Sequence, residues 1–234
     1  ARGYRLVITA RDTARLAEMR ELIPQAQLAL AGDLTDPVCL KNLLNHLKRE
    51  NIEPEVLINN AGFGLYGETL EQNSAENINL VDLNVRALTT LTLALAPSMR
   101  AKRKGYILNV ASIAAFMPCP YLSVYGASKA YVLSFSEALH EGLKTEGVHV
   151  TALCPGPVKT NFWNRAGVSE CDRFEFAITD ARSVAERGLS ALFKNKALAT
   201  YGILNKLLTV SSQLAPKGLT RLIAKEVLRL AVKK

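Results

Sequence analysis

Several features that mark secreted, metal-binding or membrane-spanning proteins are missing from this sequence of 234 residues. It has four cysteines, and they form no C-x-x-C pair and no cluster with histidine. This pattern favours a reduced, cytoplasmic setting and offers no structural metal site. No apolar run approaches the ~20 residues that a transmembrane helix needs, and the first residues carry no signal-peptide pattern. The cysteines are Cys39, Cys119, Cys154 and Cys171.

The excess of basic residues lacks the pattern of a nucleic-acid-binding surface. The net charge of +8 is spread along the chain, and no basic patch is interleaved with aromatic residues, which make up 6% of the sequence. We therefore expect no nucleic-acid partner. A phosphate-bearing cofactor would use the charge, and an ordinary solvated basic surface explains it equally well.

Short apolar segments that predict strands alternate with segments that predict helices along the whole chain. Asp36 before Pro37 is a good helix start, because aspartate caps a helix and proline suits its first position. The alternation predicts an α/β protein with a Rossmann-like, doubly wound parallel sheet and right-handed crossovers. The expected strands are Arg5–Thr9, Gln27–Ala31, Val56–Asn59, Tyr106–Val110, Val148–Cys154 and Ala197–Tyr201, and the expected helices are Thr13–Leu22, Pro37–Glu50, Ser74–Arg100, Leu122–Glu146 and Ser183–Phe193.

No repeat, low-complexity tract or linker interrupts this pattern, so we expect a single domain over residues 1–234. A hydrophobic fraction of 49% is ample for one core. Residues 201–234 form a C-terminal helical extension of that domain, apolar over Tyr201–Leu214 and basic amphipathic over Leu219–Lys234. Packing of the extension against its own domain or a sister subunit is the favoured interpretation, and attachment to a membrane surface is the alternative.

A glycine motif follows the predicted strand Val56–Asn59. The run Gly62-Phe63-Gly64-Leu65-Tyr66-Gly67 matches G-x-G-x-x-G, which binds dinucleotides when a helix opens directly at the glycines. Here residues 68–73 intervene before the next predicted helix, and Glu68 and Glu71 would repel phosphates. We therefore interpret the glycines as a tight turn at the edge of the sheet.

A second motif pairs Tyr125 with Lys129. Their spacing of four places both side chains on one helix face, one turn apart. An ammonium beside a phenol favours the phenolate, so we expect the pKa of Tyr125 to lie below its usual value near ~10. Such a tyrosine can exchange a proton near neutral pH, as general acid–base catalysis requires. By itself this spacing is also common among surface pairs on helices.

These residues stand in an order that resembles the short-chain dehydrogenase/reductase family over nearly the whole chain. The resemblance rests on several motifs at the family's spacing rather than on one pattern. The matching pieces are Asp33 in AGDLTD, NNAG at Asn59–Gly62, Asn84 in VDLNVRAL, Ser112 at the end of YILNVAS, Tyr125 and Lys129 thirteen and seventeen residues after it, and PGPVKT at Pro155–Thr160.

The resemblance implies a catalytic group made of Asn84, Ser112, Tyr125 and Lys129. Tyr125 is expected to be the acid in carbonyl reduction and the base in alcohol oxidation, while Ser112 holds the substrate oxygen. Lys129 is expected to tune Tyr125 and to hold the nicotinamide ribose, and Asn84 to anchor a proton-relay water. The expected reaction interconverts a carbonyl and a secondary alcohol without a metal.

The resemblance also implies a nicotinamide cofactor, and the end of the first predicted strand bears on its type. A carboxylate there would bind the 2′-hydroxyl of NAD, whereas a basic residue suits the 2′-phosphate of NADP. The chain has Arg11 there and no acid before Asp12, so NADP(H) is favoured over NAD. The implied cofactor contacts are Arg11 with the 2′-phosphate, Asp33 with adenine, Asn60, Ala61 and Gly62 with the adenosine ribose, Tyr125 and Lys129 beside the nicotinamide, and Pro155, Gly156, Val158 and Thr160 in the loop along it.

The start of the chain is expected to follow a missing segment. In the family, the strand that leads to Arg11 is the second one, and a first strand, a glycine-rich phosphate loop and a helix precede it. Arg2-Gly3 has the pattern of the end of that helix. The missing strand would be central in the order 3-2-1-4-5-6, leaving sheet edges at Arg5–Thr9 and Val56–Asn59. We expect such an N-terminally incomplete chain to bind NADP poorly.

The region after Thr160 bears on the substrate. Asn161-Phe162-Trp163, Phe174 and Phe176 are candidate lid residues over an apolar, acyl or steroid-like substrate, and core packing explains them equally well. By resemblance we expect a homodimer or homotetramer formed through the helices Ser74–Arg100 and Leu122–Glu146. A truncated, catalytically inactive interaction protein of the same fold is the alternative function.

Overall fold

The computed structural model describes residues 3–23, 26–168 and 179–231. The chain divides into two compact units, Ala1–Glu53 and Pro54–Lys234. Both units are α/β and all of their described strand pairs are parallel, which confirms the predicted fold class. Arg2, Cys171, Phe174 and Phe176 lie outside the described residues.

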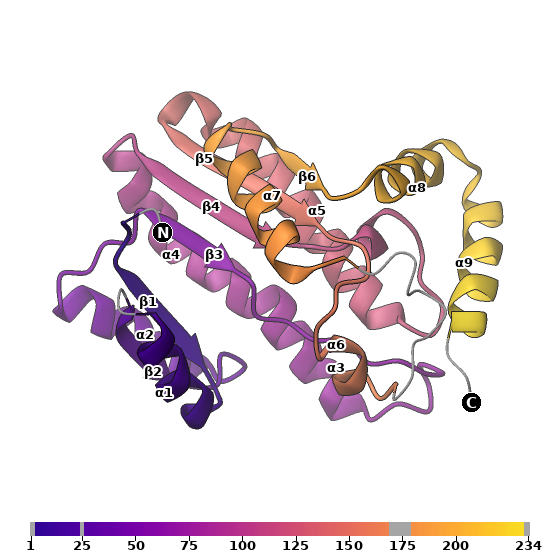
Figure 1. The fold of residues 1–234 in the computed structure, drawn as a ribbon, viewed down its shortest axis with the longest axis horizontal. Helices are drawn as coiled ribbons and strands as arrows, with labels where there is room; N and C mark the ends of the chain where they lie inside the picture. The colour runs from indigo at the N-terminus through magenta and orange to yellow at the C-terminus, as the bar shows by residue number, and fades with distance from the viewer. Residues whose placement is uncertain (1–2, 24–25, 169–178, 232–234) are drawn as a thin grey trace. The chain divides into compact units, whose positions relative to one another are not determined.

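The first unit is a parallel strand pair with two helices, coloured indigo and violet in Figure 1. Its helices begin at aspartate caps, as the sequence predicts. Asp12 accepts from the backbone N–H of Arg15, and Asp36 accepts from those of Val38 and Cys39. The elements are β1 (Leu6–Ala10), α1 (Thr13–Leu22), β2 (Ala26–Ala31) and α2 (Pro37–Arg49).

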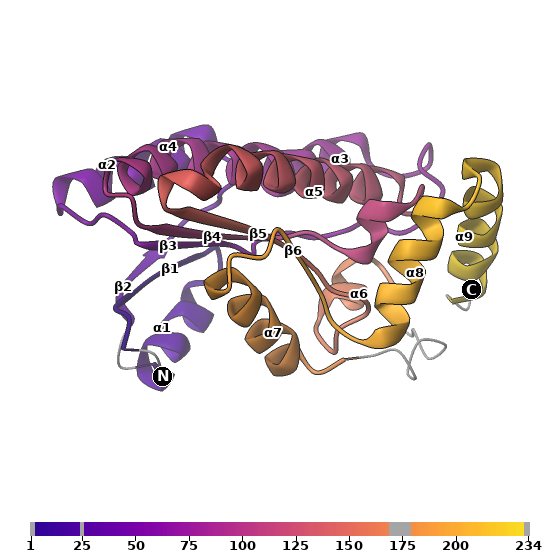
Figure 2. The ribbon, with the colours of Figure 1, turned by 90° about the horizontal axis from the view of Figure 1, so that it is seen from above.

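The second unit is a four-stranded parallel sheet in the order β3-β4-β5-β6. Helices α4 and α5 cover one face of this sheet and α7 covers the other (Figure 2). Its strands are β3 (Val56–Asn59), β4 (Gly105–Val110), β5 (Val148–Cys154) and β6 (Leu198–Thr200). Its α-helices are α3 (Ser74–Val81), α4 (Leu88–Ala101), α5 (Ser123–Leu143), α6 (Phe162–Arg165), α7 (Ala181–Phe193), α8 (Ile203–Leu214) and α9 (Lys217–Ala231).

The two faces of this sheet are set by the alternation of side chains along its strands. Ile107 on β4 packs with Val148, Val150 and Met99 on the face covered by α4 and α5. The next residue, Leu108, packs on the opposite face with the α7 residues of a second cluster. The central strands are therefore apolar on both sides, as parallel strands covered by helices require.

The predicted helix Ser74–Arg100 is more irregular than its sequence indicates. It contains a π-helical stretch, Asp82–Ala87, between α3 and α4. Among the described helices, Ser74–Ala101 is the one long and apolar enough by composition to span a membrane. The sequence pattern predicts no segment of that kind, because charged residues interrupt this helix. Core helices meet the same test, and the buried Leu80, Leu88 and Met99 assign this helix to the core.

The predicted helix Leu122–Glu146 also ends earlier than expected. The α-helix stops at Leu143 and a 3₁₀ turn over Lys144–Glu146 leads to Gly147. Gly147 has φ +79°, and a Cβ there would lie 2.1 Å from the carbonyl oxygen of Arg103. The chain can therefore enter β5 only with glycine at this position.

The described part of the chain opens with β1 and α1, and each unit has a strand that pairs on one side only. Among the described residues β1 pairs with β2 alone, and β3 pairs with β4 alone. Within the described ranges, β2 and β6 likewise pair on one side only. The expected absence of a first strand, loop and helix is not confirmed by the structure.

A network of buried amides and hydroxyls ties the strands of the second unit to its helices. The Nδ2 group of Asn59 on β3 donates to Thr92 Oγ1 at 3.0 Å and to Asn109 Oδ1 on β4 at 2.8 Å. Asn109 Nδ2 donates to Ser136 Oγ on α5 at 2.9 Å, and Ser136 donates onward to the carbonyl of Val132. Every member lies in the interior, where an unpaired polar group is costly.

We expect Asn109→Leu to lower the free energy of unfolding by about 3 kcal/mol, because Asn59 and Ser136 lose a buried partner and the larger methyl groups must fit the space of the amide. Urea unfolding monitored by circular dichroism would measure this loss. The exposed residue Asn79 provides the control substitution Asn79→Leu, expected within about 0.5 kcal/mol of the parent. Equal effects at the two positions would contradict a structural role for the network.

Candidate active site

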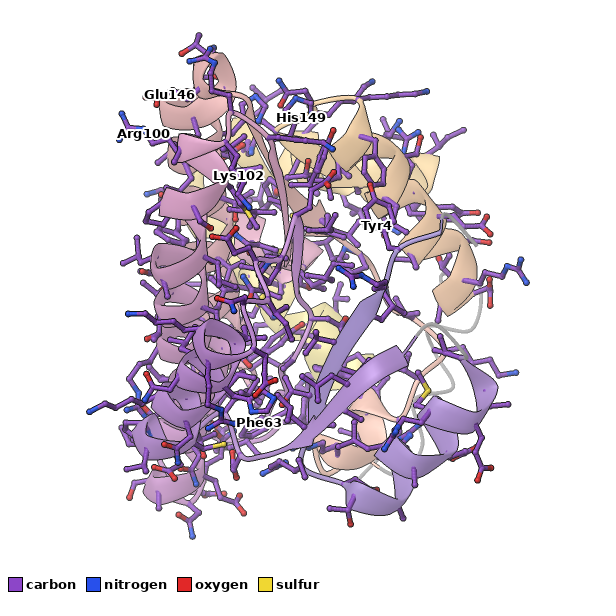
Figure 3. The ribbon with its side chains drawn as sticks, turned by 90° about the vertical axis from the view of Figure 1, so that its left-hand side faces the viewer. Tyr4, Phe63, Arg100, Lys102, Glu146 and His149 are labelled. Carbon is purple, nitrogen blue, oxygen red and sulfur yellow. The ribbon has the colours of Figure 1, made fainter. Side chains whose placement is uncertain are left out.

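The candidate site of the second unit lies where its parallel strands end. Residues 60–64 follow β3, Ser112 follows β4 and Pro155 follows β5. The carboxyl ends of strands in an open α/β sheet are where ligands bind. Figure 3 shows Phe63 toward one end of the helical layer and the Arg100–Glu146 ion pair at the other end.

Ser112 and Tyr125 meet at this edge. Ser112 ends the extended chain after β4 and caps the 3₁₀ turn Ile113–Phe116, because its Oγ accepts from the Ala114 N–H at 3.1 Å. Tyr125 lies in the first turn of α5, and its hydroxyl is hydrogen-bonded to the side chain of Ser112. The structure therefore brings together the serine and tyrosine that the sequence analysis singled out.

Burial, rather than charge, dominates the pKa of Tyr125. It raises the pKa to about 12; the Ser112 hydrogen bond acts in the opposite direction without offsetting it. The expected lowering by Lys129 is therefore wrong for this structure. Lys129 Nζ lies 5.8 Å from the centre of the Tyr125 ring and donates instead to the carbonyl of Val110 at 2.7 Å.

Lys129 is itself destabilised as a cation. Its side chain is buried inside the helix–sheet interface, and this burial lowers its pKa to about 8. The ammonium donates to a backbone carbonyl, and no carboxylate is among the charged groups that shift its pKa. A buried lysine with one neutral partner is unusual enough to mark a functional position.

Asn84 is held in the π-helical stretch, next to Lys129. Its Oδ1 accepts from the Phe63 N–H at 3.1 Å, and its Nδ2 donates to the Phe63 carbonyl and to Ser128 Oγ, both at 3.0 Å. A Cβ added to Gly62 would lie 2.9 Å from Asn84 Oδ1 and 3.3 Å from Lys129 Nζ. Gly62, Asn84 and Lys129 therefore converge on one point, and π-helical segments often occur at functional sites.

The glycine run does not open a helix, in agreement with the sequence analysis. The next helix, α3, begins at Ser74 with Asn73 as its cap. Gly64 instead permits a close aromatic approach, since a Cβ there would lie 2.8 Å from Phe162 Cζ and 3.2 Å from Tyr125 Cδ2. The run is an irregular segment with a bend at Gly67, and the nearest turn is at residues 69–71, so the expected tight turn does not lie at the glycines.

Phe162 covers Tyr125. The two rings are 5.2 Å apart at an angle of 54°, and Trp163 packs edge-on against Phe162 at 5.5 Å. Of the candidate lid residues, Phe162 therefore lies directly on the catalytic candidate, with Trp163 behind it. Asn161 lies at the start of the same short helix, α6.

The loop Pro155–Thr160 leaves β5 beside Ser112. The Pro155 carbonyl accepts from the Ile113 N–H at 3.0 Å, and Val158 forms a bridge with Thr179. Thr160 Oγ1 accepts from the Phe162 N–H at 3.3 Å. At Gly156 a Cβ would lie 2.5 Å from the amide of Asn205 on α8, so this glycine lets the helix approach the loop.

Arg11 and Asp33 form a separate polar group at the carboxyl ends of β1 and β2 in the first unit. Their side chains are 3.4 Å apart and each is about half exposed. Burial opposes ionisation of Asp33, but hydrogen bonds from the Thr35 N–H and hydroxyl, together with Arg11, hold its pKa below the ordinary value. The pair therefore presents a fixed carboxylate beside a guanidinium that water still reaches.

Several groups that shape the site carry no signal in the sequence. The carbonyl of Val110 and the backbone of Phe63 act through main-chain atoms, which every residue has. Cys154 is buried behind Ser112, and burial raises the pKa of its thiol to about 12. The position of Asn205 against Gly156 could not be found from spacing, because the two residues belong to different elements.

Comparison with known proteins agrees with this arrangement. The short chain dehydrogenase family matches residues 1–170. A "Probable NADP-dependent dehydrogenase" of Haemophilus influenzae is 34% identical over 155 residues, which are 66% of this chain and 62% of that protein. The match thus spans less than two thirds of the relative's length.

Solved structures of similar fold cover the whole chain. A short-chain dehydrogenase from Sphingobium yanoikuyae in complex with NADPH has a TM-score of 0.78 and 29% identity, covering 100% of this chain and 88% of that one. The bulky-bulky ketone specific alcohol dehydrogenase from Comamonas testosteroni has a TM-score of 0.74 and 27% identity, covering 100% and 86%. This similarity supports the predicted Rossmann-like architecture.

The lowered pKa of Lys129 predicts a pH-dependent stability. Between about pH 8 and its ordinary value of 10.5 the folded protein releases the proton before the unfolded chain does, so the free energy of unfolding rises with pH. Relative to Lys129→Met, the parent should gain roughly 2 kcal/mol between pH 7 and pH 10. Denaturant unfolding of both proteins across this range would measure the gain.

The exposed residue Lys194 supplies the matched variant Lys194→Met, which controls for the loss of one lysine. A parent and a Lys129→Met variant whose stabilities change in parallel with pH would show that the ammonium is solvated.

Proposed function

Because this chain belongs to the short-chain dehydrogenase/reductase family, we propose that it is an NADP(H)-dependent oxidoreductase that interconverts a carbonyl and a secondary alcohol. The observation that carries the proposal is the convergence of Ser112, Tyr125, Lys129 and Asn84 at the carboxyl edge of one sheet. Acid–base chemistry on a carbonyl oxygen requires a proton donor and a second hydrogen-bond donor at one place.

Tyr125 is the proton donor in the direction of reduction. Its pKa of about 12 keeps the phenol protonated at neutral pH, so the acid carries its proton before the substrate binds. Ser112 already bonds to the phenol, and its hydroxyl would hold the substrate oxygen as that oxygen gains negative charge. Lys129, one helical turn along, donates to the Val110 carbonyl and does not lower the pKa of Tyr125, so we assign it to the nicotinamide ribose rather than to the phenolate.

The carbonyl of Val110 holds Lys129 in place, and Asn84 lies near its ammonium beside Gly62. We assign Asn84 the additional role of anchoring a water beside Lys129, through which the proton lost by Tyr125 is replaced. Support comes from the close approach of Asn84 Oδ1 and Lys129 Nζ around Gly62. The phenol would then regain its proton through this water.

The residues present fit a nicotinamide dinucleotide phosphate. Asn84 and Lys129 close on the bare backbone at Gly62, which puts two hydrogen-bonding side chains beside the segment expected to lie along the ribose. In the first unit, Arg11 is a half-exposed guanidinium in a weak ion pair with Asp33. When bound, the cofactor supplies the hydride. In the second unit, the residues that we propose to hold it are Asn60, Ala61 and Gly62 along the ribose, Tyr125 and Lys129 beside the nicotinamide, and Pro155, Gly156, Val158 and Thr160 along the same end. In the first unit taken by itself, Arg11 and Asp33 have the chemistry to bind the adenosine phosphate end.

We propose an apolar ketone or alcohol as substrate. Phe162 and Trp163 form an aromatic wall against Tyr125, which an apolar group would contact without loss of hydrogen bonds. The bulky-bulky ketone specificity of the Comamonas testosteroni relative agrees with this choice. The free thiols Cys39, Cys119 and Cys154 suit a reducing, cytoplasmic location.

We also propose that two copies associate through the outer faces of α3, the following π-helical stretch, α4 and α5. Ile78, Val81 and Leu93 are exposed there, and an apolar hollow lies between Val81, Val85 and Val124. Contact between two such faces would remove these side chains from water.

We expect Tyr125→Phe to lower kcat by about 10²–10⁴-fold while the affinity for NADPH changes little, because the substitution keeps the ring and removes the hydroxyl that donates the proton. Oxidation of NADPH against a panel of apolar ketones measures the rate, and nicotinamide fluorescence measures cofactor binding. Tyr131→Phe, a matched loss of a tyrosine hydroxyl further along α5 that is bonded to Thr89, should keep the parent rate. Normal turnover by Tyr125→Phe would overturn the assignment.

Arg11→Ala should weaken NADPH binding by roughly 10–100-fold and leave NADH binding unchanged, because only NADPH carries the 2′-phosphate. Competitive fluorescence titration with the two cofactors tests this selectivity. Arg20→Ala removes an exposed arginine from the same unit and serves as the control. An equal loss of affinity for both cofactors would place Arg11 outside the phosphate site.

A further inference from the structure

Helix α8 buries its polar side and exposes its apolar side, the reverse of an amphipathic helix that packs on a protein core. Its buried positions are polar: Asn205 and Thr209 are 5% and 6% exposed. Its apolar side chains face outward, with Ile203 79%, Leu207 62%, Val210 55% and Leu214 81% exposed. These four residues recur at helical spacing and form a single stripe.

The polar side attaches α8 to the second unit. The Asn205 amide lies against Gly156 and donates to the Tyr201 carbonyl just before the helix at 2.8 Å, while the buried Thr209 bonds within the helix, to the Lys206 carbonyl. α8 also packs against the 3₁₀ turn Ile113–Phe116. The expected packing of the extension on its own domain is therefore made by the polar residues and leaves the apolar stripe in water.

Helix α9 continues the same feature. Its buried positions are the small residues Thr220 and Ala224, and its backbone is held by the Tyr66 hydroxyl, which donates to the Leu228 carbonyl at 3.0 Å. Both helices lie at one end of the second unit (yellow in Figure 1). The exposed apolar residues of α9 are Leu219, Leu222, Ile223 and Val227.

The charge of this region is one-sided. Residues 201–234 contain seven basic side chains and one acidic side chain, a net +6 out of +8 for the whole chain. The acid, Glu226, is paired with Arg229. Lys206, Lys217, Arg221 and Lys225 are exposed, so this apolar surface is bordered by unneutralised positive charge.

We propose that this C-terminal surface, made of Ile203, Leu207, Val210 and Leu214 with the exposed apolar residues of α9, binds an anionic lipid bilayer. Exposed leucines beside a row of basic residues suit the boundary between lipid headgroups and acyl chains. Basic side chains near the bilayer are attracted to anionic headgroups. A second copy fits less well, because two such faces would bring like charges together.

The test uses the full chain with large unilamellar vesicles of phosphatidylcholine alone, or of phosphatidylcholine and phosphatidylglycerol in equal parts. Co-flotation should recover the protein with the mixed vesicles and much less with the neutral ones. Leu207→Gln with Leu214→Gln should weaken binding at least roughly tenfold, and Lys217→Glu with Lys225→Glu should do the same at low salt.

Matched controls lie elsewhere on the chain. Leu22→Gln with Leu70→Gln removes two leucines that are equally exposed, and Lys41→Glu with Lys48→Glu makes the same change in net charge; both should bind vesicles like the parent. Failure of the parent to float with anionic vesicles would overturn the proposal. A second result would also overturn it: a parent that does not bind vesicles but forms a dimer in sedimentation velocity, and a variant with Leu207→Gln and Leu214→Gln that loses this dimer. Neither measurement needs cofactor or substrate, so the result is independent of the proposed activity.

Discussion

The hydrogen bond between the side chains of Asn59 and Asn109 constrains how β3 and β4 pair in the second unit. Two amides in the interior of a sheet are tolerable only when they face each other, since an unpaired amide there costs about 1–3 kcal/mol. Their bond fixes the register in which Asn59 stands opposite Asn109, because a slip of one residue would turn both amides to the wrong faces. The loop with Gly62 and the turn with Ser112 both begin within three residues of this pair, so their positions follow from it.

Around this fixed edge, burial decides which protonation states the site holds. Tyr125 and Lys129 are shifted in opposite directions, and both shifts favour the uncharged form. The short distance between them along the helix does not reverse this, because Lys129 turns toward the Val110 carbonyl. The pair therefore carries at most one charge over a wide pH range. Burying the two groups costs free energy, and the packing of α5 against the sheet must offset that cost.

The sequence is sufficient to predict where helices and strands lie, but not the pKa values and hydrogen bonds of the residues buried between them. β3, β5 and α1 could be predicted to the residue, and the rejection of Gly62–Gly67 as a phosphate loop followed from the distance to the next helix. The pKa of Tyr125 could not, because it depends on atoms from β4, β5 and α6 that lie far away in the chain. The same holds for the Asn59–Asn109 bond, and for α8, whose apolar pattern reads as a core helix until its polar side is seen to be the buried one.

The high pKa of Tyr125 has a consequence for the flow of protons. At pH 7 a phenol with a pKa of about 12 is ionised in on the order of one molecule in 10⁵. At neutral pH Tyr125 is therefore a neutral hydrogen-bonding group beside Ser112, able to give up a proton but not present as a phenolate that could take one.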